Sequence, residues 1–466
     1  MTSHIRCVSP VDGRVYADRP TTSASEIEDI LGRARAAQRR WREVPLAERA
    51  ALVVKVVAAL KAMGEDIARE LAWQMGRPIR YGQGELRGVE ERARYMAEVA
   101  PTALAPVLPI DHRPGFERWV AREPVGVVFT IAPWNYPYLT AVNSVVPALI
   151  AGNAVLLKLA AQTLLVGDRF QQAFDAIGLP GGLLTHVVLD HAQTGSIIAG
   201  GHVDHVAFTG SVEAGRAMER AAAGTFTTLG LELGGKDPAY VAPDANLPFA
   251  VENLVDGAFF NSGQCCCGVE RIYVHESRYD AFVKGYVELT SRYVLGDPLD
   301  PTTTLGPMAR ADLAELVRKQ TRDALAKGAK AHLDPSSFAR DRAGSPYLGP
   351  QVLTDVDHAM SVMRDESFGP VVGIVKVRDE AEAISSMNDS PYGLTASIWT
   401  EDAAIAKRVG AALATGTVYM NRCDYLDPGL AWTGVKDTGY GASLSSLGYG
   451  ALTRPKSYHL RLSAAG

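Results

Sequence analysis

No charged residue occurs between Val125 and Leu157, and this stretch constrains the fold more than any other part of the sequence. About 20 apolar residues can span a bilayer, so a membrane helix is the first possibility. The stretch, however, contains three prolines and three asparagines, which would break backbone hydrogen bonds and leave polar groups in lipid. We therefore interpret it as buried strands, a turn and a short helix inside a globular fold.

Beyond residue 120, short apolar runs rich in valine and isoleucine alternate with longer helical segments. Runs that are apolar throughout are typical of parallel strands with helices on both faces of the sheet. The expected strands form two sets: Val125–Ile131, Ala154–Leu157, His186–Leu189 and Val203–Phe208, then Pro238–Val241, Arg271–Val274, Val371–Val375, Ser397–Trp399 and Thr417–Met420. Two successive sets predict two α/β domains, with a boundary near Leu231–Gly235.

The two ends of the chain have other patterns. Ser25–Met75 and Leu86–Ala100 have helical periodicity, and their arginine-rich faces, which also carry glutamate, are interpreted as solvated helix surface rather than a nucleic-acid site. Arg454–Leu462 alternates between apolar and polar residues, which predicts an edge or exchanged strand.

The composition excludes several classes of protein. Of the 466 residues, 47% are hydrophobic and 21% charged, so the chain is neither disordered nor a low-complexity array. Lys and Arg number 47 against 52 Asp and Glu, and a net charge of −5 gives no general attraction to nucleic acid or anionic membranes. Five cysteines, three of them consecutive, form no disulfide framework, and the N-terminal segment lacks the apolar core of a signal peptide. We therefore expect a cytoplasmic protein.

The segment Phe259–Gly268 contains Cys265, Cys266 and Cys267 directly after a Gly-Gln pair. Adjacent cysteines do not easily converge on one tetrahedral ion, and no second cysteine and histidine cluster completes such a site, so we expect no metal. The thiols are then either buried and inert, or they include a nucleophile presented where a helix ends and a strand begins. The spacing alone leaves both interpretations open.

Three other segments carry polar groups in apolar surroundings. Glu232, between two leucines, is either the ion-pair partner of Lys236 or a general base whose pKa is raised by burial. Asn135, flanked by prolines two residues away on each side, either satisfies the turn geometry or donates its amide to an oxyanion. Gly210-Ser211 links an apolar strand to a helix, a place suited to phosphate, although the pattern is not GxGxxG.

Together these segments resemble the aldehyde dehydrogenase superfamily, from about Val8 to Tyr458, with the motifs in the family's order. The matching motifs are Pro133-Trp134-Asn135, Gly152-Asn153 with Lys158, Phe208-Thr209-Gly210-Ser211, Glu232-Leu233-Gly234-Gly235-Lys236, Gly263-Gln264 with Cys266, Glu366-Ser367-Phe368-Gly369-Pro370, Asn388 with Tyr392-Gly393-Leu394, and Gly434-Val435-Lys436. The resemblance implies an NAD(P)-dependent enzyme of the hydrolytic, non-acylating type that oxidises an aldehyde to the carboxylic acid.

The resemblance also implies an α/β fold with a Rossmann-like nucleotide-binding domain, an α/β catalytic domain and a β-strand oligomerisation arm. On this chain the nucleotide-binding domain is expected over 1–112 and 125–231, the catalytic domain over 232–438, and the arm over 113–124 and 445–466. A homodimer or homotetramer that acts on a small aldehyde, without nucleic-acid or membrane partners, is expected.

Roles can be assigned from the resemblance residue by residue. Cys266 matches the nucleophile, Glu232 the general base and Asn135 the oxyanion donor. The residues that match cofactor-binding positions are Trp134, Lys158, Gly210, Ser211, Glu366 and Phe368, and the substrate pocket is expected to involve Tyr136, Asn143, Tyr425 and Trp432. The aromatic residues suit an apolar aldehyde, whereas Asn143 and Arg422 suit a polar tail, as in a semialdehyde.

The sequence departs from the family where NAD is distinguished from NADP. Many relatives carry a glutamate three residues after the lysine at position 158, and here this residue is Ala161. Its loss removes both a contact to the ribose 2′-hydroxyl and a repulsion against a 2′-phosphate, so we expect NADP beside NAD, with a slight preference for NAD. Two alternatives are a CoA-acylating dehydrogenase, disfavoured by Glu232, and a non-catalytic member, disfavoured because all three catalytic residues are present.

Overall fold

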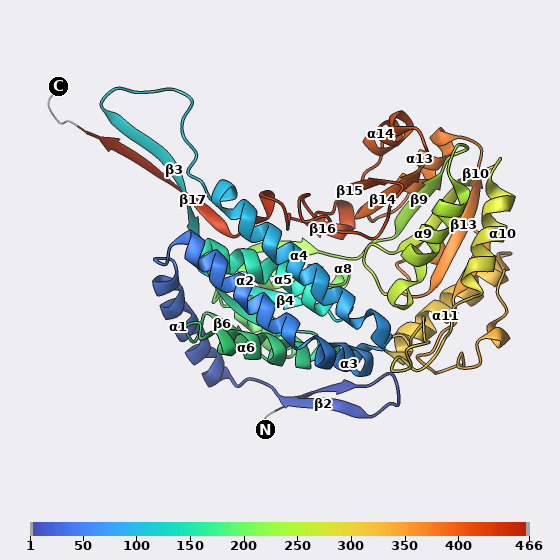
Figure 1. Ribbon diagram of the computed structural model, residues 1–466, viewed down its shortest axis with the longest axis horizontal. Helices are drawn as coiled ribbons and strands as arrows, with labels where there is room; N and C mark the ends of the chain where they lie inside the picture. Colours follow the sequence, from blue (N-terminus) through green and yellow to red (C-terminus); the bar gives the residue numbers. More distant parts are fainter. Residues whose placement is uncertain (1–2, 463–466) are drawn as a thin grey trace.

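The chain is described here by a computed structural model that covers residues 3–462 (Figure 1). It begins with an antiparallel hairpin, which four helices follow. These elements are His4–Val8 (β1), Val15–Pro20 (β2), Ala24–Trp41 (α1), Leu46–Ala62 (α2), Gly64–Met75 (α3) and Ile79–Ala103 (α4). The helices confirm the periodicity of the first hundred residues, whereas the hairpin was not predicted, because only Cys7 and Ala17 of its strands are buried.

A six-stranded sheet forms the first of two α/β units, with the strand order β16-β8-β7-β4-β5-β6. Its strands are Val127–Ala132 (β4), Ala154–Leu159 (β5), Leu184–His186 (β6), His205–Thr209 (β7), Thr228–Glu232 (β8) and Gly439–Tyr440 (β16). The helices between them are Pro137–Ala151 (α5), Leu165–Ile177 (α6), His191–Ala199 (α7) and Val212–Ala222 (α8). All neighbours are parallel except β16 and β8.

The charge-free stretch forms β4, α5 and β5 of this unit, and every residue of both strands is buried. Within residues 3–462, no helix combines the length and the apolar character that a membrane crossing requires. The strand predicted over His186–Leu189 has the wrong bounds. β6 ends at His186 because Val188 forms hydrogen bonds with Thr22, after β2, and so leaves the sheet.

A seven-stranded sheet forms the second unit, with the order β11-β12-β13-β10-β9-β14-β15, in which only β11 is antiparallel to its neighbour. Its strands are Asp237–Val241 (β9), Val269–His275 (β10), Lys330–Ala331 (β11), Gln351–Thr354 (β12), Val371–Val377 (β13), Thr395–Trp399 (β14) and Thr417–Met420 (β15). The helices are Leu247–Phe259 (α9), Tyr279–Thr290 (α10), Ala311–Ala326 (α11), Ser361–Arg364 (α12), Glu380–Asn388 (α13) and Ala403–Ala411 (α14). The two largely parallel sheets confirm the predicted fold class.

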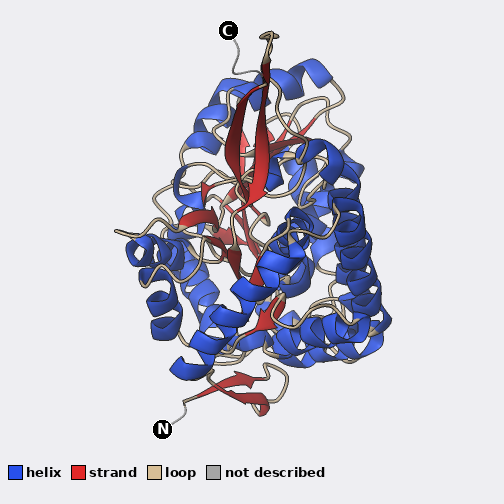
Figure 2. Cartoon of the chain, turned by 90° about the vertical axis from the view of Figure 1, so that its left-hand side faces the viewer, coloured by secondary structure: helices blue, strands red, loops and turns tan. Residues whose placement is uncertain are grey.

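The remaining strands, β3 (Phe116–Pro124) and β17 (Thr453–Arg461), pair antiparallel and project from the body of the molecule (Figures 1 and 2). The rings of Trp119 and Tyr458 stack across this pair, with centroids 4.4 Å apart. The strand predicted at Arg454–Leu462 is thus confirmed, while residues 463–466 of the expected arm lie outside the described residues.

Candidate active site

The polar residues singled out in the sequence follow the carboxyl ends of neighbouring strands in the six-stranded sheet. β4 ends just before Trp134 and Asn135, β7 ends just before Gly210, and β8 ends at Glu232. In open α/β sheets, ligands bind in the crevice outside these carboxyl ends. The segment between α9 and β10, which carries the cysteines, reaches the same edge through a hydrogen bond to Asn135.

The cysteine segment leaves α9 through a strained turn. Asn261 and Ser262 have φ values of 53° and 58°, in the left-handed region, where a non-glycine residue costs about 1–3 kcal/mol. Gly263 continues the turn with φ of 69°, and a Cβ atom there would lie 2.3 Å from the carbonyl oxygen of Gly369. Such strain persists where the surroundings determine the conformation, as they do at functional sites.

Asn135 is buried, and its side chain faces the cysteine segment. Its Nδ2 donates to the carbonyl oxygen of Gln264 at 3.2 Å, and its own carbonyl oxygen accepts from Nδ2 of Asn261 at 3.2 Å. Gln264 donates Nε2 to the Asn261 carbonyl oxygen at 3.0 Å, which closes the arrangement. The Asn135 amide therefore contacts the peptide that precedes the cysteines, in addition to any role that it has in its own turn.

A buried ion pair connects this turn to the helices around it. The guanidinium of Arg77 contacts the Glu85 carboxylate, the Asn135 carbonyl oxygen and Oδ1 of Asn261, and the side chains of Arg77 and Glu85 are 2% and 1% exposed. Oε1 of Glu85 also accepts from two backbone N–H groups in the first turn of α5, at 2.7 and 3.1 Å. One ion pair thus links α4, the start of α5 and the cysteine segment.

The sulfur atoms of Cys265, Cys266 and Cys267 lie within 4.8 Å of one another. The expectation that adjacent cysteines do not converge is therefore wrong. A turn closed by the hydrogen bond from the Gly268 N–H to the Cys265 carbonyl oxygen, at 3.1 Å, brings them together. Among residues 3–462, no histidine or carboxylate joins the three thiols as a further metal ligand.

Shared hydrogen bonds separate the pKa values of these thiols. Hydrogen bonds from Cys266 and Cys267 lower the pKa of Cys265, and the hydrogen bonds that these two make with Cys265 raise their own pKa values. The cluster therefore favours one thiolate stabilised by its two neighbours. Cys267 is buried, whereas Cys265 and Cys266 are partly exposed and accessible to a small molecule.

Glu232 does not form the ion pair that the sequence left open. Lys236 pairs instead with Glu270 in the interior of the protein. The Glu232 carboxylate accepts hydrogen bonds from two hydroxyls, Oγ of Ser443 and Oγ1 of Thr209, the latter at 3.2 Å. Burial raises the pKa of Glu232, and the two hydroxyls oppose that shift. A carboxylate with a raised pKa can accept a proton at a higher pH than an exposed glutamate can.

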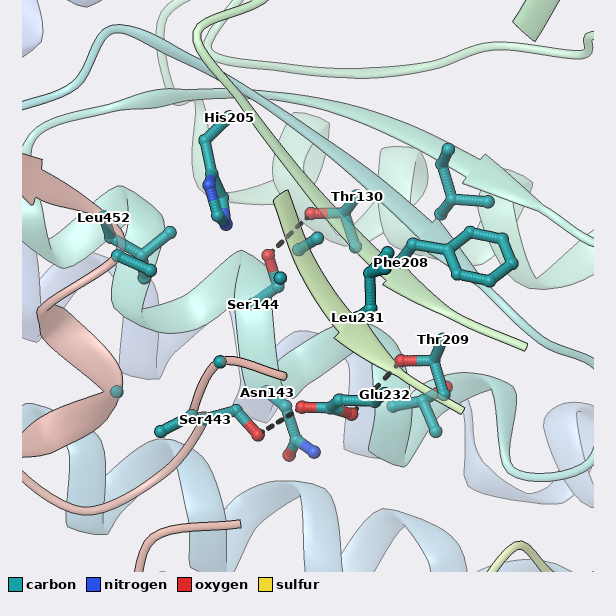
Figure 3. A pocket seen from close by; sticks show the side chains of 18 of the residues that line it. Thr130, Asn143, Ser144, His205, Phe208, Thr209, Leu231, Glu232, Ser443 and Leu452 are labelled. Carbon is teal, nitrogen blue, oxygen red and sulfur yellow. Dashed lines mark hydrogen bonds between the residues drawn. The ribbon is translucent and has the colours of Figure 1, made fainter. Parts of the chain in front are cut away.

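A cavity of about 50 Å³ opens beside Glu232 (Figure 3). Its lining includes the hydroxyl-bearing residues Thr130, Ser144, Thr209 and Ser443, and Figure 3 shows the Glu232 carboxylate between Ser443 and Thr209. These hydroxyls stand beside apolar side chains such as Leu231 and Leu452, and the volume gives room for a few water molecules. Glu232 is therefore next to space for a water that it can activate.

The residues expected on the adenosine side of a dinucleotide lie along the strand ends. Lys158 is buried in β5, and Ala161 begins the next turn with its side chain exposed. Gly210 precedes α8, and a Cβ atom there would lie 2.6 Å from the Phe208 ring, so only glycine fits. The hydroxyl of Ser211 caps α8 by accepting from the Ala214 N–H at 3.3 Å, which is a structural role.

The residues expected near the nicotinamide come from both units. The rings of Trp134, after β4, and Phe368, before β13, pack edge to face with centroids 5.5 Å apart. Oε1 of Glu366 accepts from the Gly235 N–H at 3.0 Å, and burial raises the pKa of Glu366 to about 8. The crevice between the sheets is thus lined on both sides by residues predicted from the sequence.

Two of the expected substrate-pocket residues adjoin the reactive groups. The ring of Tyr136 lies under the guanidinium of Arg77, 4.8 Å from its centroid. Asn143 is buried in α5, lines the cavity beside Glu232, and accepts at Oδ1 from Arg92 at 3.0 Å.

The other two expected pocket residues come from the segment after β15. Tyr425 donates its hydroxyl to Glu91 at 2.9 Å, and the guanidinium of Arg422 lies 3.5 Å from the centre of its ring. Trp432 is buried, and its backbone pairs with that of Ser443 at 2.8 and 2.9 Å. Trp432 therefore supports the segment from which Ser443 contacts Glu232.

The sequence analysis missed five residues of this site: Arg77, Glu85, Arg92, Asn261 and Ser443. Glu85 and Arg92 occupy the same helical face as the buried Val89 and Met96. A charged residue on an otherwise apolar helical face was therefore the signal that could have identified them. Nothing in the local pattern singles out Arg77, Asn261 or Ser443, because their partners are distant in sequence.

Comparison with known proteins agrees with this geometry. Residues 1–458 match the aldehyde dehydrogenase family. The chain is 34% identical over 448 residues to succinate semialdehyde dehydrogenase [NAD(P)+] Sad of Escherichia coli (strain K12), covering 96% of each protein. It is 34% identical to succinate-semialdehyde dehydrogenase [NADP(+)] of Deinococcus radiodurans, covering 96% of this chain and 93% of the relative.

Among solved structures, succinic semialdehyde dehydrogenase from Streptococcus pyogenes in complex with NADP+ aligns with a TM-score of 0.92 at 28% identity, covering 98% of this chain and 100% of that one. The chain belongs to the aldehyde dehydrogenase family. It oxidises aldehydes to acids and depends on NAD(P).

Proposed function

We propose that this dehydrogenase works by the hydrolytic route, with Cys266 as nucleophile, Asn135 as oxyanion donor and Glu232 as general base. The observation that carries the proposal is the arrangement around the cysteine segment. The Asn135 amide is 3.2 Å from the peptide before the thiols, and Glu232, which forms no ion pair within residues 3–462, adjoins a cavity with room for water.

The first step is addition of the Cys266 thiolate to the aldehyde carbonyl carbon, which forms a C–S bond and places negative charge on the oxygen. Nδ2 of Asn135 and the backbone N–H of Cys266 stabilise that oxyanion. One such donor is worth about 10²–10³ in rate. The Cys265 and Cys267 sulfurs form a hydrogen bond at 3.5 Å and all three sulfurs lie within 4.8 Å of one another, so a proton can move within the cluster before Cys266 attacks.

The crevice fits a dinucleotide. The N-terminus of α8 follows β7 directly at the carboxyl edge of the sheet, where Gly210 leaves no side chain in the way. Lys158 and Gly210 would hold the adenosine and phosphate side, and Trp134, Glu366 and Phe368 the nicotinamide side. When bound, NAD(P) supplies the acceptor for the hydride that leaves the substrate carbon.

The second half of the reaction is hydrolysis of the thioester. Glu232 accepts a proton from a water molecule, whose oxygen adds to the acyl carbon and releases the acid and the Cys266 thiol. Because burial raises its pKa, Glu232 becomes protonated at a higher pH than an exposed glutamate. Deacylation should therefore slow as the pH falls through that raised pKa, while acylation keeps its own pH dependence.

Glu232→Gln separates the two halves. We expect a burst of NAD(P)H equal to about one turnover per active site, followed by a steady rate lower by about 10²–10⁴, because hydride leaves before the base is needed. Rapid mixing with absorbance detection measures both phases. Glu288→Gln, an exposed glutamate on α10, is the matched control and should behave as the wild type. An unchanged steady rate without a burst would remove Glu232 from this role.

A panel of aldehydes tests the proposed function directly. NAD(P)H formation is recorded for aliphatic, aromatic and carboxylated aldehydes, each with NAD or NADP and with or without CoA. We expect reduction without CoA and release of the free acid. Reduction only with CoA would show the acylating reaction instead, and no reduction despite cofactor binding would contradict the enzymatic assignment.

For the cofactor we propose that both NAD and NADP are accepted. The slight preference for NAD expected from the sequence has no support among the relatives, whose names include both NAD(P)+ and NADP(+). Ala161 is exposed and uncharged, so no carboxylate at this position repels a 2′-phosphate.

Ala161→Glu should shift the preference toward NAD. The new carboxylate can accept from the ribose 2′-hydroxyl and repels the 2′-phosphate, so we expect the ratio of kcat/KM for NAD to that for NADP to rise about tenfold or more. Ala161→Gln, of similar size without the charge, is the control. If both variants keep the wild-type ratio, this position plays no part in cofactor choice.

We further propose that the domains follow the spans expected from the sequence, with β16 added to the nucleotide-binding unit because it pairs with β8. The arm of β3 and β17 projects from the body, and Val107 covers the outer edge of β3 only at Val120, which suits pairing with another copy in a dimer or tetramer. All five cysteines are free thiols, in keeping with a reducing compartment such as the cytoplasm.

A further inference from the structure

Within the part of the chain that the structure describes, Arg92 is a buried cation without an acidic partner. It lies on the inner face of α4 and is 7% exposed. Its Nη1 donates to the carbonyl oxygen of Leu139 and to Oδ1 of Asn143, both at 3.0 Å. No carboxylate within residues 3–462 forms an ion pair with it, although charged side chains are almost never buried unless paired.

The unused part of the guanidinium is one complete edge. Nε and Nη2 of Arg92 have no hydrogen-bond partner among the described residues, and neither atom is sealed away from accessible space. The buried Arg271 is different, because each of its three nitrogens donates to a carbonyl oxygen. The Nε–Nη2 edge is the face that binds a carboxylate through two parallel hydrogen bonds.

The free edge of Arg92 lies in the same region of the protein as the residues that we propose to react. Asn143, which holds Nη1, lines the cavity that also contains Glu232. Burial lowers the pKa of Arg92, and the negative charges of Glu232 and of the thiols at Cys267 and Cys266 oppose that shift. Through Asn143, Arg92 is therefore one side chain away from the cavity beside Glu232.

Neighbouring acids do not already use this edge. Glu85 pairs with Arg77, and Glu91, the residue before Arg92, accepts from the Tyr425 hydroxyl at 2.9 Å. Glu232 is held by two hydroxyls. Within residues 3–462 the edge is therefore left available to an anion from outside the chain.

We propose that Arg92 binds a carboxylate on the substrate, at the end opposite the aldehyde, so that the enzyme prefers short aldehydes that carry such a group. The proposal rests on the proposed function, because the aldehyde end must bond to the Cys266 sulfur. Arg92 determines specificity: the Asn143 amide orients the guanidinium, and its free edge forms the two hydrogen bonds to the carboxylate.

The test compares substrate pairs of equal length, 4-oxobutanoate with butanal and 5-oxopentanoate with pentanal. Arg92→Met keeps the volume but removes the charge. We expect kcat/KM for the carboxylated member to fall about 10- to 100-fold, mostly through KM, while the neutral member changes less than about threefold. Arg92→Lys keeps a charge without the bidentate edge and should fall in between. Arg94→Met, which removes an exposed arginine from the same helix, is the matched control.

Two outcomes would overturn the proposal. An equal loss for both members, with the fall in rate at low pH moved to higher pH, would show that Arg92 keeps Glu232 ionised and does not select substrates. Equal kcat/KM for the two members in the wild type would show that the carboxylate is not recognised. In either case NAD(P)H formation from the neutral aldehydes would leave the dehydrogenase function intact, whereas absence of oxidation of every substrate would refute that function itself.

A measurement on the wild type covers the case in which Arg92 variants do not fold. Succinate has one carboxylate for Arg92 and one for the oxyanion region, whereas butanoate has only one. We expect succinate to inhibit butanal oxidation, in competition with the aldehyde, at a concentration at least tenfold lower than butanoate. Equal inhibition by the two acids would contradict a second anion site.

Discussion

Replacing Cys266 with alanine should abolish aldehyde oxidation while cofactor binding persists. Without the thiolate no covalent intermediate forms, and loss of a catalytic nucleophile costs on the order of 10⁴-fold or more in kcat. The change removes one sulfur atom from a partly exposed position, so the fold should tolerate it. NAD(P)H formation measures the activity, and quenching of tryptophan fluorescence measures cofactor binding.

The neighbouring thiols provide the controls for this prediction. Cys265→Ala and Cys267→Ala should retain turnover, although loss of a hydrogen bond within the cluster changes the pH at which the nucleophile ionises. Cys265 has the lowered pKa in the free protein, which makes it the strongest rival. If Cys266→Ala retained turnover and Cys265→Ala abolished it, the nucleophile would be Cys265.

Replacing Arg77 with methionine should destabilise the protein by about 3–5 kcal/mol, the largest stability effect we expect from one side chain near the site. The change leaves the Glu85 carboxylate buried without its cation. Removing one partner of a buried ion pair lowers the stability of the fold by far more than the intact pair raises it. The carbonyl oxygen of Asn135 also loses a donor. Urea unfolding measures the change, and kcat should fall in the variant that remains folded, because Asn135 is no longer held.

The double variant Arg77→Met with Glu85→Gln tests the reason for that loss. Glutamine at position 85 keeps an acceptor for the two N–H groups at the start of α5 but carries no charge. We therefore expect the double variant to recover a large part of the lost stability. A loss below about 1 kcal/mol in the single variant would mean that water reaches Glu85 when Arg77 is absent.

Much of the candidate site was predictable because its residues stand in short local patterns. Asn135 follows one buried strand, Gly210 the next, and Glu232 ends a third, and parallel strands bring such positions to one edge. The same logic identified the two sheets and the strand at the C-terminal end. It failed at His186–Leu189, where a hydrogen bond to Thr22, far away in the chain, decides where the strand ends.

The pairing of buried charges could not be read from sequence distance. Lys236 is four residues from Glu232, yet it pairs with Glu270, because β9 and β10 are neighbours in the same sheet. The expectation that adjacent cysteines do not easily converge on one tetrahedral ion likewise took no account of the local turn, in which a single hydrogen bond brings the three sulfur atoms close together.

The sequence by itself determined the α/β class and the family, and it suggested the groups that we propose to react, because periodicity and motif order are local properties of the chain. Only the tertiary structure decided how those groups are held and what surrounds them. The Arg77 guanidinium contacts the Asn135 carbonyl oxygen from another segment of the chain. Ser443 donates to Glu232, although the two residues are far apart in the sequence. Arg92 presents an unused edge beside Asn143. Each of these contacts depends on the low-dielectric interior that packing creates. There an unpaired charge or polar group strongly lowers the stability of the fold, and its partner is the group that lies near it in space.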